Sequence, residues 1–296
     1  MSKILQLTPI FFISLQFSKE GTIIMKETIK ILYISQEIMP YLPETEISAI
    51  CRSLPQAVQE RGREIRTFMP RFGTINERRN QLHEVIRLSG MNLIIDDSDH
   101  PLIIKVASIP SARMQVYFID NDDYFHRKAA FTDENGEEYP DNDERIVFFV
   151  RGVMETVKKL RWAPDIVHCH GWMTALAPLY IKKAYNEDPF FKNSKVVYSV
   201  YNHEFNTPFS ETFHKKVVID GVEHSDLECL KDCDIDFKAL MKFAINYSDG
   251  VIQGSECIDE DVLDHIFQTG KPFLKHCCRE TFVEKYDDFY SLISEL

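Results

Sequence analysis

The sequence predicts an α/β fold built around a largely parallel sheet. From residue 28 onward, short runs rich in Ile, Val and Tyr alternate with amphipathic segments, which is the pattern of successive β-α-β units. The chain has 296 residues and is 44% hydrophobic, enough to bury a large core. One apolar run, residues 165–170, ends in two histidines and turns at once into a helical segment. We therefore expect a single α/β domain followed by a carboxy-terminal helix.

The first β-α-β unit is predicted over residues 29–69. Residues 29–35 form an apolar run typical of a strand, and the next helix begins at Thr45, a suitable N-cap, and stops at Gly62. Residues 64–69 supply the second strand of the unit. Three further candidate strands lie close enough together to predict a meander or hairpin edge, at 91–95, 102–107 and 114–119.

The second half of the chain continues the alternation. Residues 121–140 are polar and predict a surface loop that ends at Asp141, an expected N-cap with Glu144 at the third helical position. The histidine-bearing strand at 165–170 then leads into a helix expected over 172–184. The remaining elements are expected as a strand at 196–200, a helix at 236–247, a strand at 250–254 and an amphipathic tail helix at 281–296.

Charge and cysteine content narrow the function classes. The formal net charge of -12 repels phosphate backbones and anionic lipid, so we expect neither general nucleic-acid binding nor membrane binding. Seven cysteines are an odd number, and their spacings match neither a zinc site nor a disulfide framework. Reduced thiols and a cytoplasmic location are therefore the expectation.

The first two dozen residues do not fit the rest of the chain. Residues 4–17 are apolar but interrupted by polar side chains, with only Lys3 ahead of them and no small-residue cleavage site behind. We favour Met25 as the true start, because residues 19–21 can be encoded by a purine-rich stretch like a bacterial ribosome-binding site. The alternative is a genuine disordered leader or a failed signal peptide. The expected organisation is a non-native or disordered leader over 1–24, a domain over 25–270 and a tail over 271–296.

The strand that ends at His170 is the first candidate site, because ligands of open α/β sheets bind at the carboxyl ends of parallel strands. Strand alternation puts His168 and His170 on one face, as ligand-facing groups or as side chains that satisfy the strand end. After the next strand, His203 and Glu204 could supply an acid or base beside His170, or lie in a surface turn without chemistry. A zinc ion held by the three histidines and a carboxylate is a further alternative, although we expect no metal.

Several motifs, in order and at sensible spacing, resemble the amino-terminal half of bacterial glycogen synthases and starch synthases. They are Leu54-Pro55 with 60–62, residues 69–73, residues 116–120, Tyr139 with Asp141, Asn142 and Arg145, and above all residues 165–172. The resemblance implies one Rossmann-like lobe of a two-lobed GT-B glycosyltransferase. It also implies transfer of glucose from ADP-glucose to an α-1,4-glucan, with the glucan bound mainly to this lobe and the nucleotide mainly to the other.

The chain departs from the family pattern at three places. Where the family has a Lys-Thr-Gly-Gly-Leu loop that approaches phosphates, residues 43–47 read Pro-Glu-Thr-Glu-Ile. Gly171 stands where the family has a catalytic-centre Asp, and Tyr201 stands where it has a His that reaches the transferred sugar. We also expect the chain to end where the nucleotide lobe would begin.

Two functions follow from this resemblance. The favoured one is a truncated, catalytically degenerate glucan-side domain, which binds α-glucan or a partner enzyme of glycogen metabolism. The alternative is an active glucosyltransferase with ADP-glucose as donor, completed by a partner chain that supplies the nucleotide lobe. No cofactor is expected in either case. Catalytic candidates are His168, His170, His203 and Glu204, and candidate glucan-binding residues are Trp172, Asn202, Asp141 and Asn142. Trp172 could stack on a sugar or pack in the core, and capping alone could explain Asp141.

Overall fold

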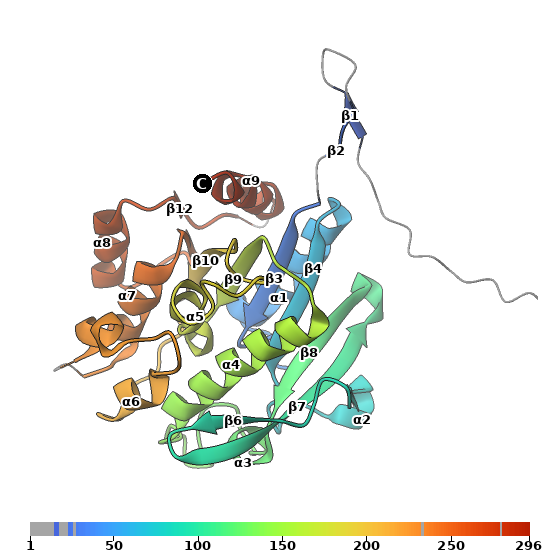
Figure 1. Ribbon diagram of the computed structural model, residues 1–296. Helices are drawn as coiled ribbons and strands as arrows, with labels where there is room; N and C mark the ends of the chain where they lie inside the picture. The colour runs from blue at the N-terminus through green and yellow to red at the C-terminus, as the bar shows by residue number, and fades with distance from the viewer. Residues whose placement is uncertain (1–14, 18–22, 26–27, 232–233, 279) are drawn as a thin grey trace, which may run out of the picture.

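The computed structural model describes residues 15–17, 23–25, 28–231, 234–278 and 280–296 (Figure 1). Its centre is a ten-stranded sheet in the order β12-β11-β10-β9-β3-β4-β8-β7-β5, with β6 paired to β7. The strands from β12 to β8 are parallel, whereas β7 is antiparallel to β8 and β5 is antiparallel to β7. The sheet strands are β3 (Lys30–Ser35), β4 (Glu64–Pro70), β5 (His83–Glu84), β6 (Met91–Ile95), β7 (Ser98–Ile109), β8 (Met114–Asp120), β9 (Ile166–His170), β10 (Lys195–Val200), β11 (Gly250–Gln253) and β12 (Phe273–Leu274).

The direction of the chain across the sheet reverses at β3. From β3 the chain moves outward to β4 and β8, and it later returns to β9 on the opposite side of β3. The carboxyl ends of β3 and β9 therefore form the topological switch point, where open α/β sheets bind their ligands. The predicted parallel sheet and the antiparallel edge formed by β6, β7 and β8 are both confirmed.

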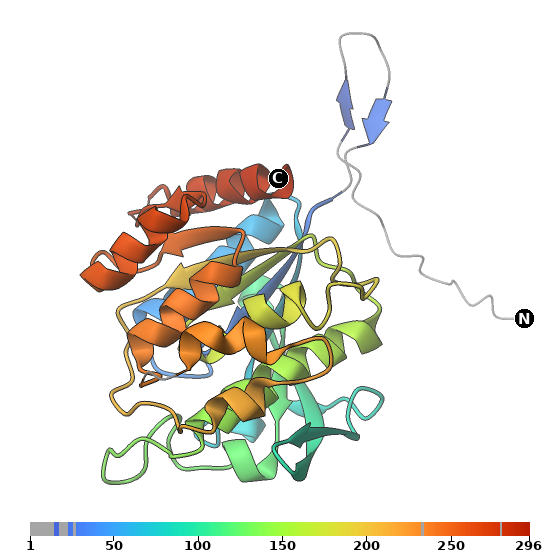
Figure 2. The same cartoon turned by 60° about the vertical axis from the view of Figure 1, so that its left-hand side comes forward.

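Helices cover both faces of the sheet. The helices α4, α5 and α7 pack on one face, and α1 and α9 pack on the other (Figures 1 and 2). The α-helices are α1 (Glu46–Glu60), α2 (Glu77–Asn80), α3 (Asp122–Phe125), α4 (Asn142–Leu160), α5 (Ala177–Lys182), α6 (Phe213–Val217), α7 (Phe237–Tyr247), α8 (Glu260–Thr269) and α9 (Phe282–Ser294), with 3-10 turns η1 (Pro110–Ala112), η2 (Trp172–Thr174) and η3 (His224–Leu230).

The tail helix α9 packs on the sheet of its own chain. Its buried side chains Tyr286, Phe289, Tyr290 and Ile293 join a cluster with residues of α1, β3, β9, β10 and β11. Strand alternation produces this second layer, because Ile31 and Tyr33 of β3 face α9 whereas Leu32 and Ile34 face the other helices. The apolar face that the sequence pattern predicts for the tail helix is therefore the face buried against the domain.

The structure corrects three expectations about helices. Asp141 precedes α4 but makes no side-chain cap bond, because its carboxylate binds Arg127 instead. The helix expected over 172–184 is broken into η2 and α5, since Pro178 lies at the start of the second segment. Residues 121–140 contain the short helix α3, whose N-cap Asn121 accepts hydrogen bonds from the backbone.

The leader predicted over residues 1–24 lies largely outside the described residues. β1 (Leu15–Phe17), inside this range, forms an antiparallel pair with β2 (Ile23–Met25), which crosses its end. Among the described helices, none combines the length and the apolar character that a membrane span requires.

Candidate functional site

The carboxyl ends of β3 and β9 meet at the switch point. The Gln36 backbone N–H donates to the His170 carbonyl oxygen at 3.1 Å, which extends the parallel pairing one residue beyond β3. Ser35, Gln36 and Glu37 are all buried, although two of them have long polar side chains. A buried polar side chain needs partners, so the contacts of Gln36 and Glu37 define this site.

The Gln36 carboxamide lies directly against Gly171. Gly171 has φ +85° and ψ 164°, a backbone region essentially confined to glycine. A Cβ atom at this position would clash with the Gln36 side chain. Gly171 is the position at which the resemblance expects an aspartate, so backbone conformation and the Gln36 side chain both exclude a side chain there.

Glu37 is held by three polar neighbours. Its Oε1 atom accepts from Gln36 Nε2 at 3.1 Å, and its Oε2 atom accepts from the Thr45 hydroxyl at 2.6 Å. The same Gln36 amide nitrogen lies 2.8 Å from His203 Nδ1, which is 3.6 Å from Glu37 Oε1. The His203 side chain is 41% exposed and the Glu37 side chain only 5%. Gln36 therefore links a buried carboxylate to an imidazole at the surface.

His168 and His170 lie in the layer beneath α9. His168 Nδ1 is 2.6 Å from the Tyr290 hydroxyl and its Nε2 is 2.7 Å from the Ser199 hydroxyl. His170 Nδ1 is 2.8 Å from the Tyr201 hydroxyl. Both imidazoles are fully buried, so they act here as internal hydrogen-bonding groups rather than as surface groups.

Burial also determines the charge state of these imidazoles. It lowers the pKa of His170 to about 3. It lowers the pKa of His168 as well, and the adjacent His170 ring adds to that effect. The two ring centroids are only 3.8 Å apart. Both rings are therefore neutral at pH 7.

Tyr201 fills the second position where the resemblance expects a functional side chain. It is 3% exposed, and its ring packs so closely on Gly254 that a Cβ atom there would clash with it. Its hydroxyl contacts His170. Burial raises the pKa of Tyr201 well above its ordinary value, so this phenol keeps its proton. A buried phenol therefore occupies the position at which the resemblance expects an imidazole that reaches the transferred sugar.

The segment 43–47, which replaces the family's glycine-rich loop, begins α1. The Thr45 side chain accepts from the Ser48 backbone N–H at 3.0 Å, as the predicted N-cap. The Glu46 carboxylate accepts from the Ser255 hydroxyl, and Ser255 in turn accepts from the Asn202 backbone N–H at 2.9 Å. These groups connect the start of α1 to the ends of β10 and β11.

The four predicted glucan-binding residues lie in different environments. Trp172 is 2% exposed and is packed among Phe131, Phe205 and Phe209. Asn202 is exposed at the end of β10.

Asp141 and Asn142 support the start of α4. Asn142 is buried, donates to the Phe131 carbonyl oxygen at 3.1 Å and accepts from Arg145 at 2.6 Å. Asp141 pairs with Arg127. Asn202 is thus the member of the predicted set that reaches the surface at the strand ends.

The His203–Glu204 pair separates in space. His203 turns inward to Gln36 and Glu37, whereas Glu204 is exposed. Within the described residues, the histidines of the zinc alternative do not converge as metal ligands, because His203 contacts the switch point while His168 and His170 lie under α9.

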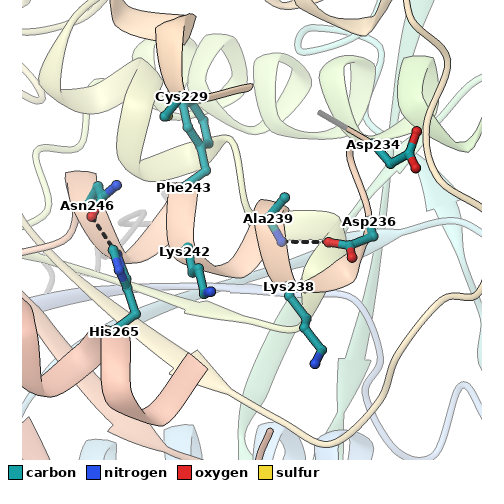
Figure 3. Close-up of a pocket in the computed structure, with 9 residues that line it drawn as sticks. All are labelled: Cys229, Asp234, Asp236, Lys238, Ala239, Lys242, Phe243, Asn246 and His265. Atoms are coloured by element: carbon teal, nitrogen blue, oxygen red, sulfur yellow. Dashed lines mark hydrogen bonds between the residues drawn. The ribbon is translucent and has the colours of Figure 1, made fainter. Parts of the chain in front are cut away.

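A separate hollow lies beside α7 and α8 (Figure 3), and none of the predicted site residues lines it. Several of its polar side chains bind nearby groups. Lys238 binds Asp259 at 2.8 Å, and His265 Nε2 is 2.7 Å from Asn246 Oδ1. None of its lining residues belongs to the switch point.

Gln36 and Glu37 were not predicted from the sequence. They directly follow the first strand, and this position at a strand end is the signal that could have identified them. Their effect depends on Gly171 and His203, which lie more than a hundred residues away along the chain.

The fold and the switch-point site define one lobe of a GT-B glycosyltransferase. The family model described as starch synthase catalytic domain matches residues 30–272. The chain belongs to this family of starch and glycogen synthases. A solved structure, the catalytic domain of Starch Synthase IV from Arabidopsis thaliana bound to ADP and acarbose, superposes with a TM-score of 0.68 at 17% identity, over 84% of this chain and 51% of that chain.

Curated relatives agree with the family. The Glycogen synthase of Chlorobium limicola is 41% identical over 178 residues, which are 60% of this chain and 36% of the relative. The Glycogen synthase of Chlorobium chlorochromatii is 39% identical over 204 residues, which are 69% of this chain and 42% of the relative. The chain therefore spans less than half the length of these relatives.

Proposed function

We propose that this chain acts in α-1,4-glucan metabolism as a glucan-side domain whose own switch-point site does not transfer glucose. Family membership and the relatives named glycogen synthase support the glucan as ligand. The observation that carries the loss of transfer is the Gln36 carboxamide packed over Gly171. A neutral amide at this position neither exchanges a proton nor stabilises positive charge as a carboxylate would.

The negative charge at this edge of the sheet supports the same proposal. Glu44 and Glu46 are exposed at the start of α1, and the buried carboxylate of Glu37 lies behind them. The diphosphate group of a sugar nucleotide is repelled by carboxylates, whereas an uncharged glucan is not. Exposed Asn202 and the half-exposed His203 offer hydrogen-bonding groups for sugar hydroxyls at this edge.

One observation favours the second candidate, an active glucosyltransferase. His203 is accessible, and Glu37 lies 3.6 Å from its Nδ1 atom. The Gln36 amide bridges this imidazole to the carboxylate, and an accessible imidazole is a suitable general acid or base. In this alternative ADP-glucose is the donor, and a partner chain supplies the nucleotide lobe. For both candidates we propose a cytoplasmic protein that binds neither membranes nor nucleic acid.

Ligand binding separates the two candidates. We expect glycogen in a native gel to retard the chain, and titration calorimetry with ADP-glucose to give no binding heat. The glycogen synthase of Chlorobium limicola, tested in parallel, is the positive control for both ligands. Asn202→Ala should weaken the retardation, whereas His224→Ala, an exposed control in η3, should not. ADP-glucose binding by this chain alone would contradict the proposal, as would unretarded migration in glycogen.

A further inference from the structure

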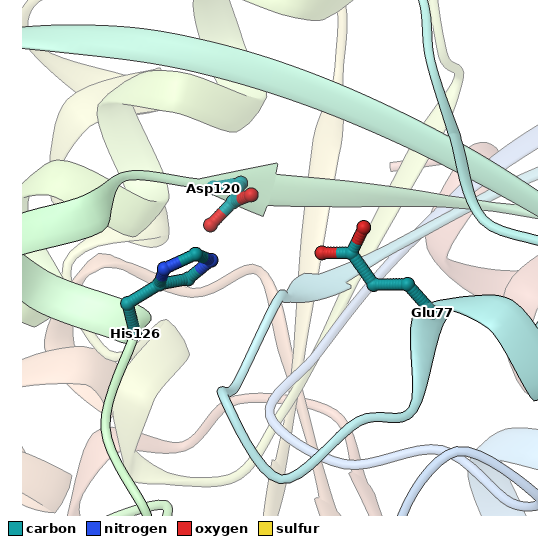
Figure 4. A group of neighbouring side chains, drawn as sticks. All are labelled: Glu77, Asp120 and His126. Carbon is teal, nitrogen blue, oxygen red and sulfur yellow. The ribbon is translucent and has the colours of Figure 1, made fainter.

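Three potential metal ligands meet at the carboxyl end of β8, on the same edge of the sheet as the switch point but two strands away from β3. Glu77 comes from α2, Asp120 ends β8, and His126 follows α3. Each offers one ligand atom, and these atoms all lie within 4.8 Å of one another. Figure 4 shows the three side chains pointing toward one another. Two carboxylates and an imidazole are a ligand set that suits divalent ions from Mn²⁺ to Zn²⁺.

Asp120 provides an independent indication that a cation belongs here. Its side chain is 1% exposed, and its Oδ1 atom accepts no hydrogen bond from any described residue. A buried carboxylate oxygen without a donor is costly. A bound cation would satisfy this oxygen.

His126 is oriented by a carboxylate on its other side. Its Nδ1 atom lies 3.4 Å from Asp122 Oδ1, one helical turn earlier. Metal-binding histidines commonly direct one ring nitrogen to a carboxylate and the other to the ion. This contact leaves Nε2 of His126 for the cluster.

Lys105 at present supplies the positive charge. Its Nζ atom is 2.6 Å from Glu77 Oε1 and 2.8 Å from Asp120 Oδ2. Arg71 also binds Glu77 and lies 3.9 Å from Asp120. An incoming ion must therefore compete with the Lys105 ammonium, which is carried on a flexible four-carbon stem and can turn toward solvent.

We propose that Glu77, Asp120 and His126 bind a divalent transition-metal ion in competition with the ammonium of Lys105. Metal–ligand bonds of about 2.0–2.2 Å place ligand atoms about 3.5 Å apart, so the cluster must contract by about 1 Å. Glu77 and His126 can make this movement, because their side chains are 32% and 44% exposed. The ion would connect β8 to α2 and to the loop after α3. This proposal is independent of the proposed glucan function.

The competition predicts opposite effects for two substitutions. Lys105→Met removes the competing ammonium and should tighten binding of one Mn²⁺ per chain at least tenfold. His126→Ala removes a ligand and should weaken it at least tenfold, whereas His224→Ala, an exposed histidine in η3, should leave it unchanged. Loss of the free Mn²⁺ signal in electron paramagnetic resonance measures each affinity on the purified chain. Mn²⁺ is the probe because thiolates compete poorly for it.

Folding is checked for every variant by circular dichroism, and Lys105→Gln replaces Lys105→Met if the latter does not fold. Tighter binding without Lys105 together with weaker binding without His126 supports the site. The proposal is overturned if neither Lys105 variant binds Mn²⁺ more tightly than the unmodified chain. It is equally overturned if His126→Ala binds as well as His224→Ala.

Discussion

Replacing Gly171 by alanine adds one methyl group at the most constrained position of the switch point. The φ of +85° and ψ of 164° cost an alanine about 1–3 kcal/mol of backbone strain. The new Cβ also displaces Gln36, whose bonds to Glu37 and His203 are worth about 0.5–1.5 kcal/mol each. We expect Gly171→Ala to lower the free energy of unfolding by about 2–6 kcal/mol.

Gly136 is a control for the cost of a positive φ. It has the same φ of +85°, and a Cβ atom there would meet nothing within 4 Å. Gly136→Ala should therefore show the strain alone, about 1–3 kcal/mol. Combining Gly171→Ala with Gln36→Ala removes the clash, so the double variant should be about 1–3 kcal/mol more stable than the sum of the single effects.

Urea denaturation followed by tryptophan fluorescence measures all four variants, and Trp172 directly follows the substituted glycine. Equal costs for Gly171→Ala and Gly136→Ala, with additive effects in the double variant, would refute the packing of Gln36 on Gly171.

Three further predictions concern the layer under α9 and the start of α4. Because burial lowers the pKa of both imidazoles of β9, the stability that depends on their neutral forms is complete well above pH 6.5 and lost as pH falls toward 3. For His170 alone, unfolding at pH 5 should cost about 2 kcal/mol less than at pH 7.5, and His168 should change the stability in the same direction; a flat profile in urea titrations would contradict this. Tyr290→Phe should destabilise by about 1–2 kcal/mol in thermal or urea unfolding, because it leaves a buried ring nitrogen without its partner, whereas Leu292→Ala on the exposed side of α9 should have little effect. Asp141→Asn should destabilise by about 1 kcal/mol through loss of the Arg127 ion pair; since asparagine caps as well as aspartate, an unchanged stability would instead support a capping role.

The sequence predicted the sheet well because buried strands carry their own signal. The apolar runs at β3, β4, β9 and β10 are bounded by polar or turn residues, and each lies where it was expected. The helix α8 was missed because its buried side chains are only Val262 and Ile266, a weak periodic signal. Asp141 lies at the predicted N-cap position, but its side-chain cap bond is missing because its partner Arg127 comes from a preceding loop that local pattern does not place.

The candidate site was predictable in position but not in composition. The histidines at the end of β9 indicated the edge at which β3 and β9 end, and the departures at Gly171 and Tyr201 were visible in the sequence. The sequence does not show that the Gln36 side chain packs on Gly171, because this contact depends on the pairing of β3 with β9. Similarly, the amphipathic tail indicated a buried face, but only the sheet register places Tyr290 on His168.

The central claim is tested most directly by measuring incorporation of labelled glucose from ADP-glucose into glycogen by the purified chain, with glycogen binding measured in the same tubes. The Chlorobium limicola synthase serves as the positive control. We expect binding to glycogen with incorporation no higher than in tubes without protein. Incorporation above that blank, reduced by His203→Ala in a chain that still folds, would show an active transferase and contradict the account.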